Sequence, residues 1–279
     1  MAVNLATKYE SKIAEAFTLT SLTEAAVNKD FSWLGSEAIK VFGITTQALT
    51  NYNRTATSNR FGTPAELQNV VQTMLVNMDR AFSISIDSST IDSTNGAIQA
   101  GKVLKMQIAE QVTPEIDIYR IRRMYNAAIA NSAFAYAAVT SSNAYTKFLA
   151  AQSVLGDAKV PQSGRIAFIS YTFLGLIKQD STFMLASEVA MNERINGMVG
   201  MVDGVKLIPV PSTYLAPNVS FILTHPMATV AAEKLTEYNV RTNVQGFSGV
   251  VLEGRVRYDA FVINQKVNAI YVQGTALIS

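Results

Sequence analysis

Histidine and cysteine, two side chains that often serve as catalytic bases, nucleophiles and metal ligands, are nearly absent from this sequence. It has one histidine, His225, and no cysteine. A single imidazole cannot build a site of several histidine ligands, and the lack of cysteine excludes disulfides, thiolate metal sites and cysteine nucleophiles. His225 directly precedes Pro226, and we expect Thr224 or His225 to cap a helix that begins there. The composition therefore predicts no metal and no cofactor.

Two carboxylate pairs, Glu115 with Asp117 and Glu253 with Asp259, could in principle perform acid–base chemistry. The second pair belongs to EGRVRYD (253–259), where opposite charges alternate as in cross-strand ion pairs. The segment GMVGMVDG (197–204) is rich in glycine but lacks the spacing of nucleotide-binding loops, and we interpret it as a flexible loop. No catalytic site is predicted.

The charge content narrows the classes of function. Only 16% of the residues are charged, 49% are hydrophobic, and the net charge is +2. A charge content below the usual quarter suggests that contacts with other protein cover part of the surface. The basic cluster YRIRRM (119–124) is a weak nucleic-acid signal, and we interpret it as a solvated or ion-paired helix face. No membrane-spanning segment or signal peptide is recognisable.

Residues 1–30 begin with an apolar residue at every fourth position: Leu5, Tyr9, Ile13 and Phe17. This spacing predicts one apolar helical face. An amphipathic arm and an ordinary first helix packed on its own core remain open alternatives.

The segment 36–90 is the most informative part of the chain. Ile39, Val41, Phe42 and Ile44 suggest a strand, and the polar segment 45–69 that follows is far longer than a hairpin turn. Within it, the capping-box pattern TPAE (63–66) predicts a short helical turn. Beyond it, apolar side chains recur on one face of an alternating run: Val70, Met74, Val76, Met78, Phe82, Ile84 and Ile86.

One strand over 70–86 would be roughly 55 Å long, well beyond the usual length of globular strands. A ribbon of that length exposes hydrogen-bonding edges, so it must lie against its own chain or against a neighbour. Two successive strands in an ordinary sheet remain the alternative.

The hydrophobic period changes to that of a helix between 95 and 130. Its apolar stripe consists of Leu104, Ile108, Val112, Ile116 and Tyr119. Thr113 and Pro114 could start a second helix, but the stripe stays in phase across the proline, which favours one long kinked helix.

The remainder predicts a mixed α+β or α/β domain. Helices are expected over 142–156, 171–179 and 226–238. Strands are expected over 165–170, 205–211, 219–224, 250–263 and 269–273.

Several stretches resemble the major capsid proteins of tailed bacteriophages, in the same order along the chain. They are SLTEAAVNKDFSWLGSEAIKV (21–41), RFGTPAELQNVVQTM (60–74), AGKVLKMQIAEQVTPEIDIYR (100–120), VPQSGRIAFISYTFLGLIKQD (160–180), VDGVKLIPVPS (202–212), FILTHPMA (221–228) and LEGRVRYDAFVINQKVNAIYV (252–272). The set spans nearly the whole chain.

The resemblance implies an α+β protein of the Hong Kong 97 type. It implies an N-terminal arm (1–35), an extended β-hairpin called the E-loop (36–92) and a peripheral (P) domain with a long spine helix (93–135 and 245–265). The axial (A) domain would comprise 136–244 and 266–279. Contacts between subunits are then expected at Arg54, Arg60, Phe61, Met74, Val76, Arg120 and Arg123.

The implied function is a shell subunit, without enzyme activity, that assembles as pentamers and hexamers into the icosahedral head of the virion and encloses double-stranded DNA. Because the resemblance begins almost at Met1, a separate scaffolding protein is expected, together with a portal, and assembly in the host cytoplasm. The alternatives are an encapsulin-like shell around protein cargo and a carboxylate-dependent hydrolase.

Overall fold

The computed structural model describes residues 21–28, 30–31, 38–44, 48–63, 66, 69–87, 96–180, 200–242, 244, 246 and 248–275 of the 279-residue chain. The expected arm helix with its four-residue spacing lies outside these residues, and so does the centre of the expected helical turn at 63–66.

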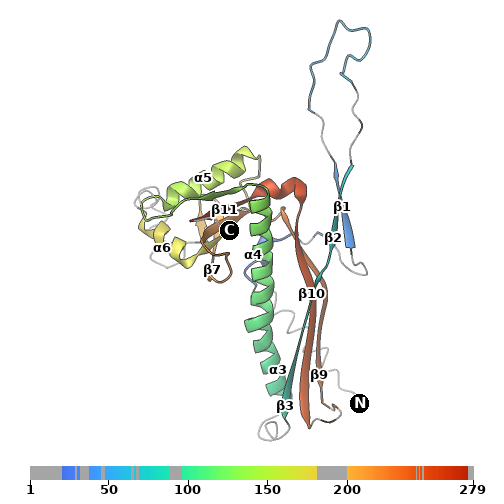
Figure 1. The fold of residues 1–279 in the computed structure, drawn as a ribbon, viewed down its shortest axis with the longest axis vertical. Helices are drawn as coiled ribbons and strands as arrows, with labels where there is room; N and C mark the ends of the chain where they lie inside the picture. Colours follow the sequence, from blue (N-terminus) through green and yellow to red (C-terminus); the bar gives the residue numbers. More distant parts are fainter. Residues whose placement is uncertain are drawn as a thin grey trace.

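A long helix forms the axis of the molecule (Figure 1). It consists of α3 (Gly96–Gln107), the π-helical turn η2 (Ile108–Val112) and α4 (Thr113–Ala130), which follow one another without a break. Pro114 has no N–H, and its ring conflicts with the carbonyl of the residue four positions earlier. The π turn accommodates this conflict, since the N–H of Thr113 donates to the carbonyl of Ile108, five residues back. The prediction of one long helix is confirmed.

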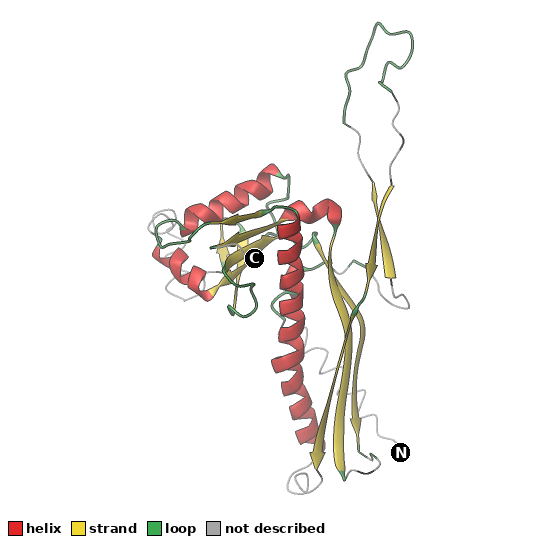
Figure 2. Cartoon of the chain, viewed as in Figure 1, coloured by secondary structure: helices red, strands yellow, loops and turns green. Residues whose placement is uncertain are grey.

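A three-stranded antiparallel sheet runs beside this helix, in the order β3-β10-β9 (Figure 2). Its strands are β3 (Met78–Asp87), β10 (Gly249–Val262) and β9 (Thr229–Arg241). The sheet buries one face against α3 and α4, where Leu252 and Tyr258 pack against Leu104 and Ile116. Fully burying a large apolar side chain stabilises the fold by about 1.5–3 kcal/mol, so this face fixes the sheet on the helix.

A second sheet of six strands forms the other part of the body, in the order β4-β11-β8-β5-β7-β6. Its strands are β4 (Phe134–Tyr136), β5 (Ile166–Ser170), β6 (Met201–Val202), β7 (Val205–Val210), β8 (Val219–Thr224) and β11 (Ile270–Gly274). The short helices η1 (Glu24–Ala26) and η3 (Asn264–Ala269) complete the described elements.

Both faces of this sheet are covered, because alternate residues of β5 contribute to two different cores. Ile166 and Phe168 pack with Met124 of α4 on one face. Ala167 and Ile169 pack on the other face with α5 (Ala144–Asp157) and α6 (Tyr171–Gln179). All five residues of β5 are buried, as expected for a strand covered on both sides.

Two sequence predictions fail in this region. The helix expected at 226–238 is instead β9, which pairs with β10 beside the spine helix, so the chain passes from one sheet to the other at 225–228. The flexible loop expected at 197–204 includes residues outside the described range. Its described end forms part of a hairpin, in which Asp203 and Gly204 adopt the positive φ angles (48° and 78°) of a two-residue turn between β6 and β7.

The hairpin of β1 (Ala38–Ile44) and β2 (Asn69–Leu75) projects from the body (Figure 1). β2 ends at Leu75 and β3 begins at Met78, so the single strand expected over 70–86 is wrong, and two successive strands belong to different sheets. The hairpin itself, a long excursion from the body, is confirmed.

Candidate inter-subunit surface

The far end of the projecting hairpin, residues 48–63, is an ordered loop, referred to below as the tip. The N–H of Asn53 donates to the carbonyl of Arg60 at 3.0 Å, and the hydroxyl of Thr50 donates to the carbonyl of Phe61 at 3.0 Å. Asn59 and Gly62 adopt positive φ angles of 52° and 88°, which reverse the chain. Within the described chain, both partners of each tip hydrogen bond lie in the tip.

The tip exposes apolar side chains that its own chain does not cover. Leu49 is 102% exposed, Phe61 85% and Tyr52 48%. The rings of Tyr52 and Phe61 meet edge to face, with 5.0 Å between their centroids. A cluster of this kind at the end of a projection is typical of a surface that contacts another protein.

Three of the seven predicted contact residues lie on this tip. Arg54, Arg60 and Phe61 are all exposed, and Arg60 Nε donates to the carbonyl of Ala56 at 2.7 Å. Sequence reasoning did not select Leu49 and Tyr52, although two large apolar residues in a polar segment are a usable signal.

Two others, Met74 and Val76, are buried within the chain itself. They are 0% and 3% exposed and pack against Val230, Ala232 and Ile263. Their side chains therefore face the body of their own subunit and are not available to a neighbour. The alternation identified the apolar face of the ribbon correctly but not what covers it.

Arg120 is also internal. It is 1% exposed, and its guanidinium donates to Glu233 Oε1 at 2.6 Å, Glu24 Oε2 at 3.0 Å and Thr23 Oγ1 at 3.1 Å. A buried charge must be paired and hydrogen-bonded, and here three partners meet that requirement. Arg120 thus joins α4 to β9 and to the segment 21–28.

Asp117, one helical turn before Arg120, holds the same segment. Its carboxylate accepts hydrogen bonds from Ser21 Oγ at 2.7 Å, the N–H of Leu22 at 2.9 Å and Thr23 Oγ1 at 2.6 Å. The segment continues into a β-bridge between Asn28 and Val230. Residues 21–28 are therefore fixed along the spine helix. The other half of the predicted acid–base pair, Glu115, accepts from Arg80 Nε at 2.7 Å and from the hydroxyl of Tyr258 at 3.1 Å.

The outward face of the three-stranded sheet carries the predicted cross-strand ion pairs, which are confirmed. Arg255 donates two hydrogen bonds to Asp79, at 3.0 and 2.6 Å, and Arg241 lies 2.9 Å from Glu253. The hydrogen bond from Arg255 holds the pKa of Asp79 below its ordinary value. The carboxylates of Glu115, Asp117 and Glu253 thus have structural partners.

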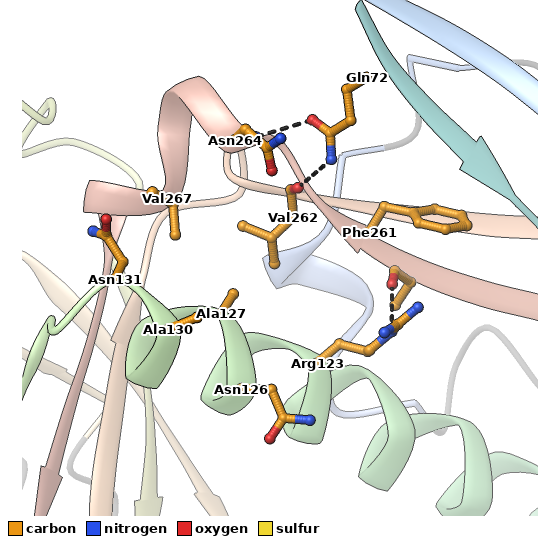
Figure 3. A pocket seen from close by; sticks show the side chains of 11 residues that line it. Gln72, Arg123, Asn126, Ala127, Ala130, Asn131, Phe261, Val262, Asn264 and Val267 are labelled. Carbon is orange, nitrogen blue, oxygen red and sulfur yellow. Dashed lines mark hydrogen bonds between the residues drawn. The ribbon is translucent and has the colours of Figure 1, made fainter.

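Arg123, the last predicted contact residue, is 40% exposed in its side chain and lies in the wall of a cavity of about 500 Å³ (Figure 3). Its guanidinium donates to the carbonyl of Ala260 at 3.1 Å and to Asp259 Oδ1 at 3.3 Å. The cavity lies between the end of α4 and the root of the hairpin, where Gln72, Asn126, Val262 and Asn264 also contribute to its wall.

His225 has a structural place. Its Nδ1 accepts from the N–H of Met227 at 3.2 Å, so its Nε2 is the donor to the carbonyl of Ser163 at 3.1 Å. It shapes the turn between β8 and β9, whereas the helix that it was expected to cap does not form. The described residues hold no group of three or more potential metal ligands, and none of their helices is long and apolar enough to cross a membrane.

No protein-family model matches the chain, and no curated protein matches it by sequence. Solved structures do match. A chain from Mycobacterium phage Che8 superimposes with a TM-score of 0.70 at 14% identity, over 92% of this chain and 91% of that one. The capsid of cyanophage P-SCSP1u gives 0.68 at 10% identity, over 90% and 86% of the two chains. The mature capsid of bacteriophage PhiM1 gives 0.67 at 13%, over 91% and 86%.

The chain has the Hong Kong 97 fold. The agreement extends over about nine tenths of both chains, so the fold class expected from the sequence is confirmed. In the terms of this fold, the projecting hairpin is the E-loop and the long helix is the spine. Identity of 14% or less explains why no sequence comparison found the relationship.

Proposed function

We propose that the chain is the major capsid protein of a tailed bacteriophage, and that it assembles as pentamers and hexamers into an icosahedral head around double-stranded DNA. The observation that carries this proposal is the Hong Kong 97 fold together with an E-loop whose tip presents Leu49 and Phe61 almost fully exposed. The matched capsids of cyanophage P-SCSP1u and bacteriophage PhiM1 support it.

The proposed contact places the tip of one subunit on the body of the next. Such a contact joins two different surfaces of the same chain, and contacts of this type generate rings where the rotation between neighbours closes. Phe61, Leu49 and Tyr52 supply apolar area, and Arg54 and Arg60 supply charge at its edge. Arg54 is exposed, so its guanidinium can meet a carboxylate of a neighbour. Arg123 is also proposed to contact a neighbouring subunit, because its side chain is partly exposed.

We assign the P domain to the spine helix with the sheet of β3, β10 and β9, and the A domain to the six-stranded sheet with α5 and α6. The E-loop extends from this body, and the contacts of Asp117 and Arg120 hold residues 21–28 of the expected N-terminal arm on it. Rings of five and six then differ in how arm and E-loop meet their neighbours.

The same proposal includes a separate scaffolding protein, a portal, assembly in the bacterial cytoplasm and a final place in the virion. A subunit with a net charge of +2 suits a shell that encloses DNA without gripping it. The role is structural and requires no catalysis.

Two experiments test this function. In the first, the chain is expressed with the scaffolding protein from the same genome and the products are imaged in negative stain. In the second, particles from infected cells are treated with nuclease and analysed for protected DNA. Closed heads that contain DNA support it. Closed particles that contain a protein cargo and no DNA would instead identify an encapsulin-like compartment, since that class shares the fold.

A further inference from the structure

The E-loop leaves the body at a short junction, Val76 and Asn77, where one strand changes partner. Leu75 still pairs with Ala38 of β1, whereas Met78 already pairs with Tyr258 of β10. The amide of Asn77 thus belongs to neither ladder. A backbone donor without a ladder partner needs another acceptor.

Asp259 of β10 supplies that acceptor. Its Oδ2 accepts from the N–H of Asn77 at 3.1 Å. Its Oδ1 accepts from the hydroxyl of Tyr119 at 2.8 Å, the N–H of Ala260 at 2.7 Å and Arg123 at 3.3 Å. Asp259 is 1% exposed, so its carboxylate depends on these donors in place of water. One oxygen holds the E-loop and the other holds the spine helix.

Gln72, five residues further out on the E-loop, makes a second directed contact. Its side-chain Nε2 donates to the carbonyl of Val262 at 2.8 Å, and its Oε1 accepts from the N–H of Asn264 at 3.0 Å. On β1, Gly43 leaves room for the side chain of Gln265, with which a Cβ at this position would collide. The E-loop is therefore hydrogen-bonded to the body at Asn77 and at Gln72. Contacts at two positions along the strand constrain the direction in which the E-loop leaves the body.

The packing around these two points differs. Met74 and Val76 hold the root by apolar contact, which has no preferred direction. Beside Gln72, however, lies the cavity of about 500 Å³ between α4 and the E-loop root (Figure 3). Toward α4, the side chain of Gln72 therefore borders open space, and its two hydrogen bonds supply the directed contact there, next to the close approach of Gln265 to Gly43.

We infer that Asp259 and Gln72 are positioning residues that set the angle at which the E-loop leaves the body, and through it the curvature of the assembled shell. The step from angle to curvature rests on the proposed function, because it requires that the tip contacts a neighbour. The step from the two contacts to the angle concerns the single chain and can be measured separately.

The first variants are Asp259→Asn and Gln72→Leu, studied as full chains. In Asp259→Asn, the side-chain N–H₂ group faces a donor that now bonds to a carboxylate oxygen, so that hydrogen bond is lost. We expect hydrogen exchange at the amide of Asn77 to become about tenfold faster in Asp259→Asn. Exchange at Leu252 and Gly254, deeper in the same sheet, should stay within about twofold. Unchanged exchange at Asn77 in a folded Asp259→Asn would overturn the role of Asp259.

The second measurement is the distribution of particle diameters after assembly. Both variants should broaden it or produce tubes, whereas Val256→Ala should not. Val256 lies in the same strand and packs against the helix, so its truncation lowers stability without touching the E-loop. A single wild-type diameter for both variants, or an equal broadening for Val256→Ala, contradicts the inference.

Two further outcomes are distinguishable. If Asp259→Asn does not fold, Gln72→Leu decides the question, since Gln72 contacts the body only through its side-chain amide among the described hydrogen bonds. If the wild-type chain forms no particles, the proposed function fails, while the exchange rate at Asn77 still tests whether Asp259 holds the E-loop.

Discussion

The guanidinium of Arg120 lies 2.6 Å from Glu233 Oε1 and connects the middle of the spine helix to β9. The same guanidinium lies 3.0 Å from Glu24, in the segment that leads to the N-terminal arm. One buried cation therefore joins three parts of the chain that lie far apart in sequence. Removing one partner of a buried pair leaves the others charged and uncompensated, which is costly.

Arg120→Ala is expected to lower the free energy of unfolding by about 1–3 kcal/mol, because Glu24 and Glu233 lose their common partner although solvent still reaches both carboxylates. Arg122→Ala is the control, since Arg122 is exposed on the same helix and should change stability by less than about 0.5 kcal/mol. Urea denaturation of the unassembled subunit measures both. Equal stability of the two variants contradicts the role given to Arg120.

Gly254→Ala is expected to destabilise the three-stranded sheet. Gly254 pairs with Phe82 on one side and Tyr238 on the other, and a Cβ there would collide with the ring of Phe82. Overpacking of this kind costs about 1–3 kcal/mol. Thermal unfolding should show the loss, and Phe82→Leu in the same chain should recover part of it.

The matched control for that change is Gly156→Ala. Gly156 lies in α5 with open space where a Cβ would be placed. Alanine should therefore be neutral or stabilise by up to about 1 kcal/mol. A loss of stability for Gly156→Ala equal to that of Gly254→Ala would mean that the collision with Phe82 is not the cause.

Stability should fall at alkaline pH. Burial, followed by the hydrogen bond to Asp259, raises the pKa of Tyr119 to about 12, and burial raises the pKa of Tyr238 to about 12. Both lie above the ordinary value of 10.0, so the folded state keeps protons that the unfolded state has released. The stabilisation is complete below pH 10 and is lost as the pH rises toward 12.

Melting temperatures between about pH 9 and pH 11.5 measure this loss. Tyr119→Phe and Tyr238→Phe should each flatten the alkaline decline, because one titrating hydroxyl is removed. Tyr171→Phe, an exposed tyrosine of α6 that is 61% accessible, should leave the slope unchanged. A pH-independent melting temperature over this range contradicts the burial of these hydroxyls.

Phe61→Ala separates assembly from folding. Because Phe61 is 85% exposed at the tip, its loss should change the melting temperature of the subunit by no more than about one degree. The critical concentration for shells should rise, whereas Phe61→Tyr, which keeps the ring, should assemble nearly as well. A marked drop in melting temperature without an effect on assembly would assign Phe61 to the chain's own packing.

Ile84→Asp should behave in the opposite way. Ile84 is partly buried and packs against the core between the three-stranded sheet and the spine helix, where an unpaired carboxylate is costly. The variant should fail to fold before any effect on assembly can be measured. Far-ultraviolet circular dichroism of the purified subunit distinguishes an unfolded variant from a folded variant that does not assemble.

Local periodicity predicted much of this fold, since the spine helix, β5, α6 and the charged strand β10 all formed as their patterns indicated. β9 did not follow its pattern, because the helix formers around Ala232 and Glu233 were overruled by pairing along β10. The break between β2 and β3 could not be seen, since apolar residues stay in phase from Met74 through Val76 to Met78.

The candidate surface was predicted only in part, for a related reason. Alternation shows that Met74 and Val76 need cover, but not that Val230 and Ile263 of the same chain provide it. Arg120 is basic and lies in a basic cluster, and only the fold brings Glu24 and Glu233 to it. Phe61 lies in a segment without a core pattern and is exposed, whereas its contact with a neighbour stays a prediction.

Cryo-electron microscopy of the purified protein, assembled with its scaffolding protein, tests the central claim most directly. The account predicts closed icosahedral shells of pentamers and hexamers, in which residues 48–63 of each subunit contact the body of a neighbour. A protein that remains monomeric at high micromolar concentration, or a shell in which the tip contacts only its own chain, would contradict it.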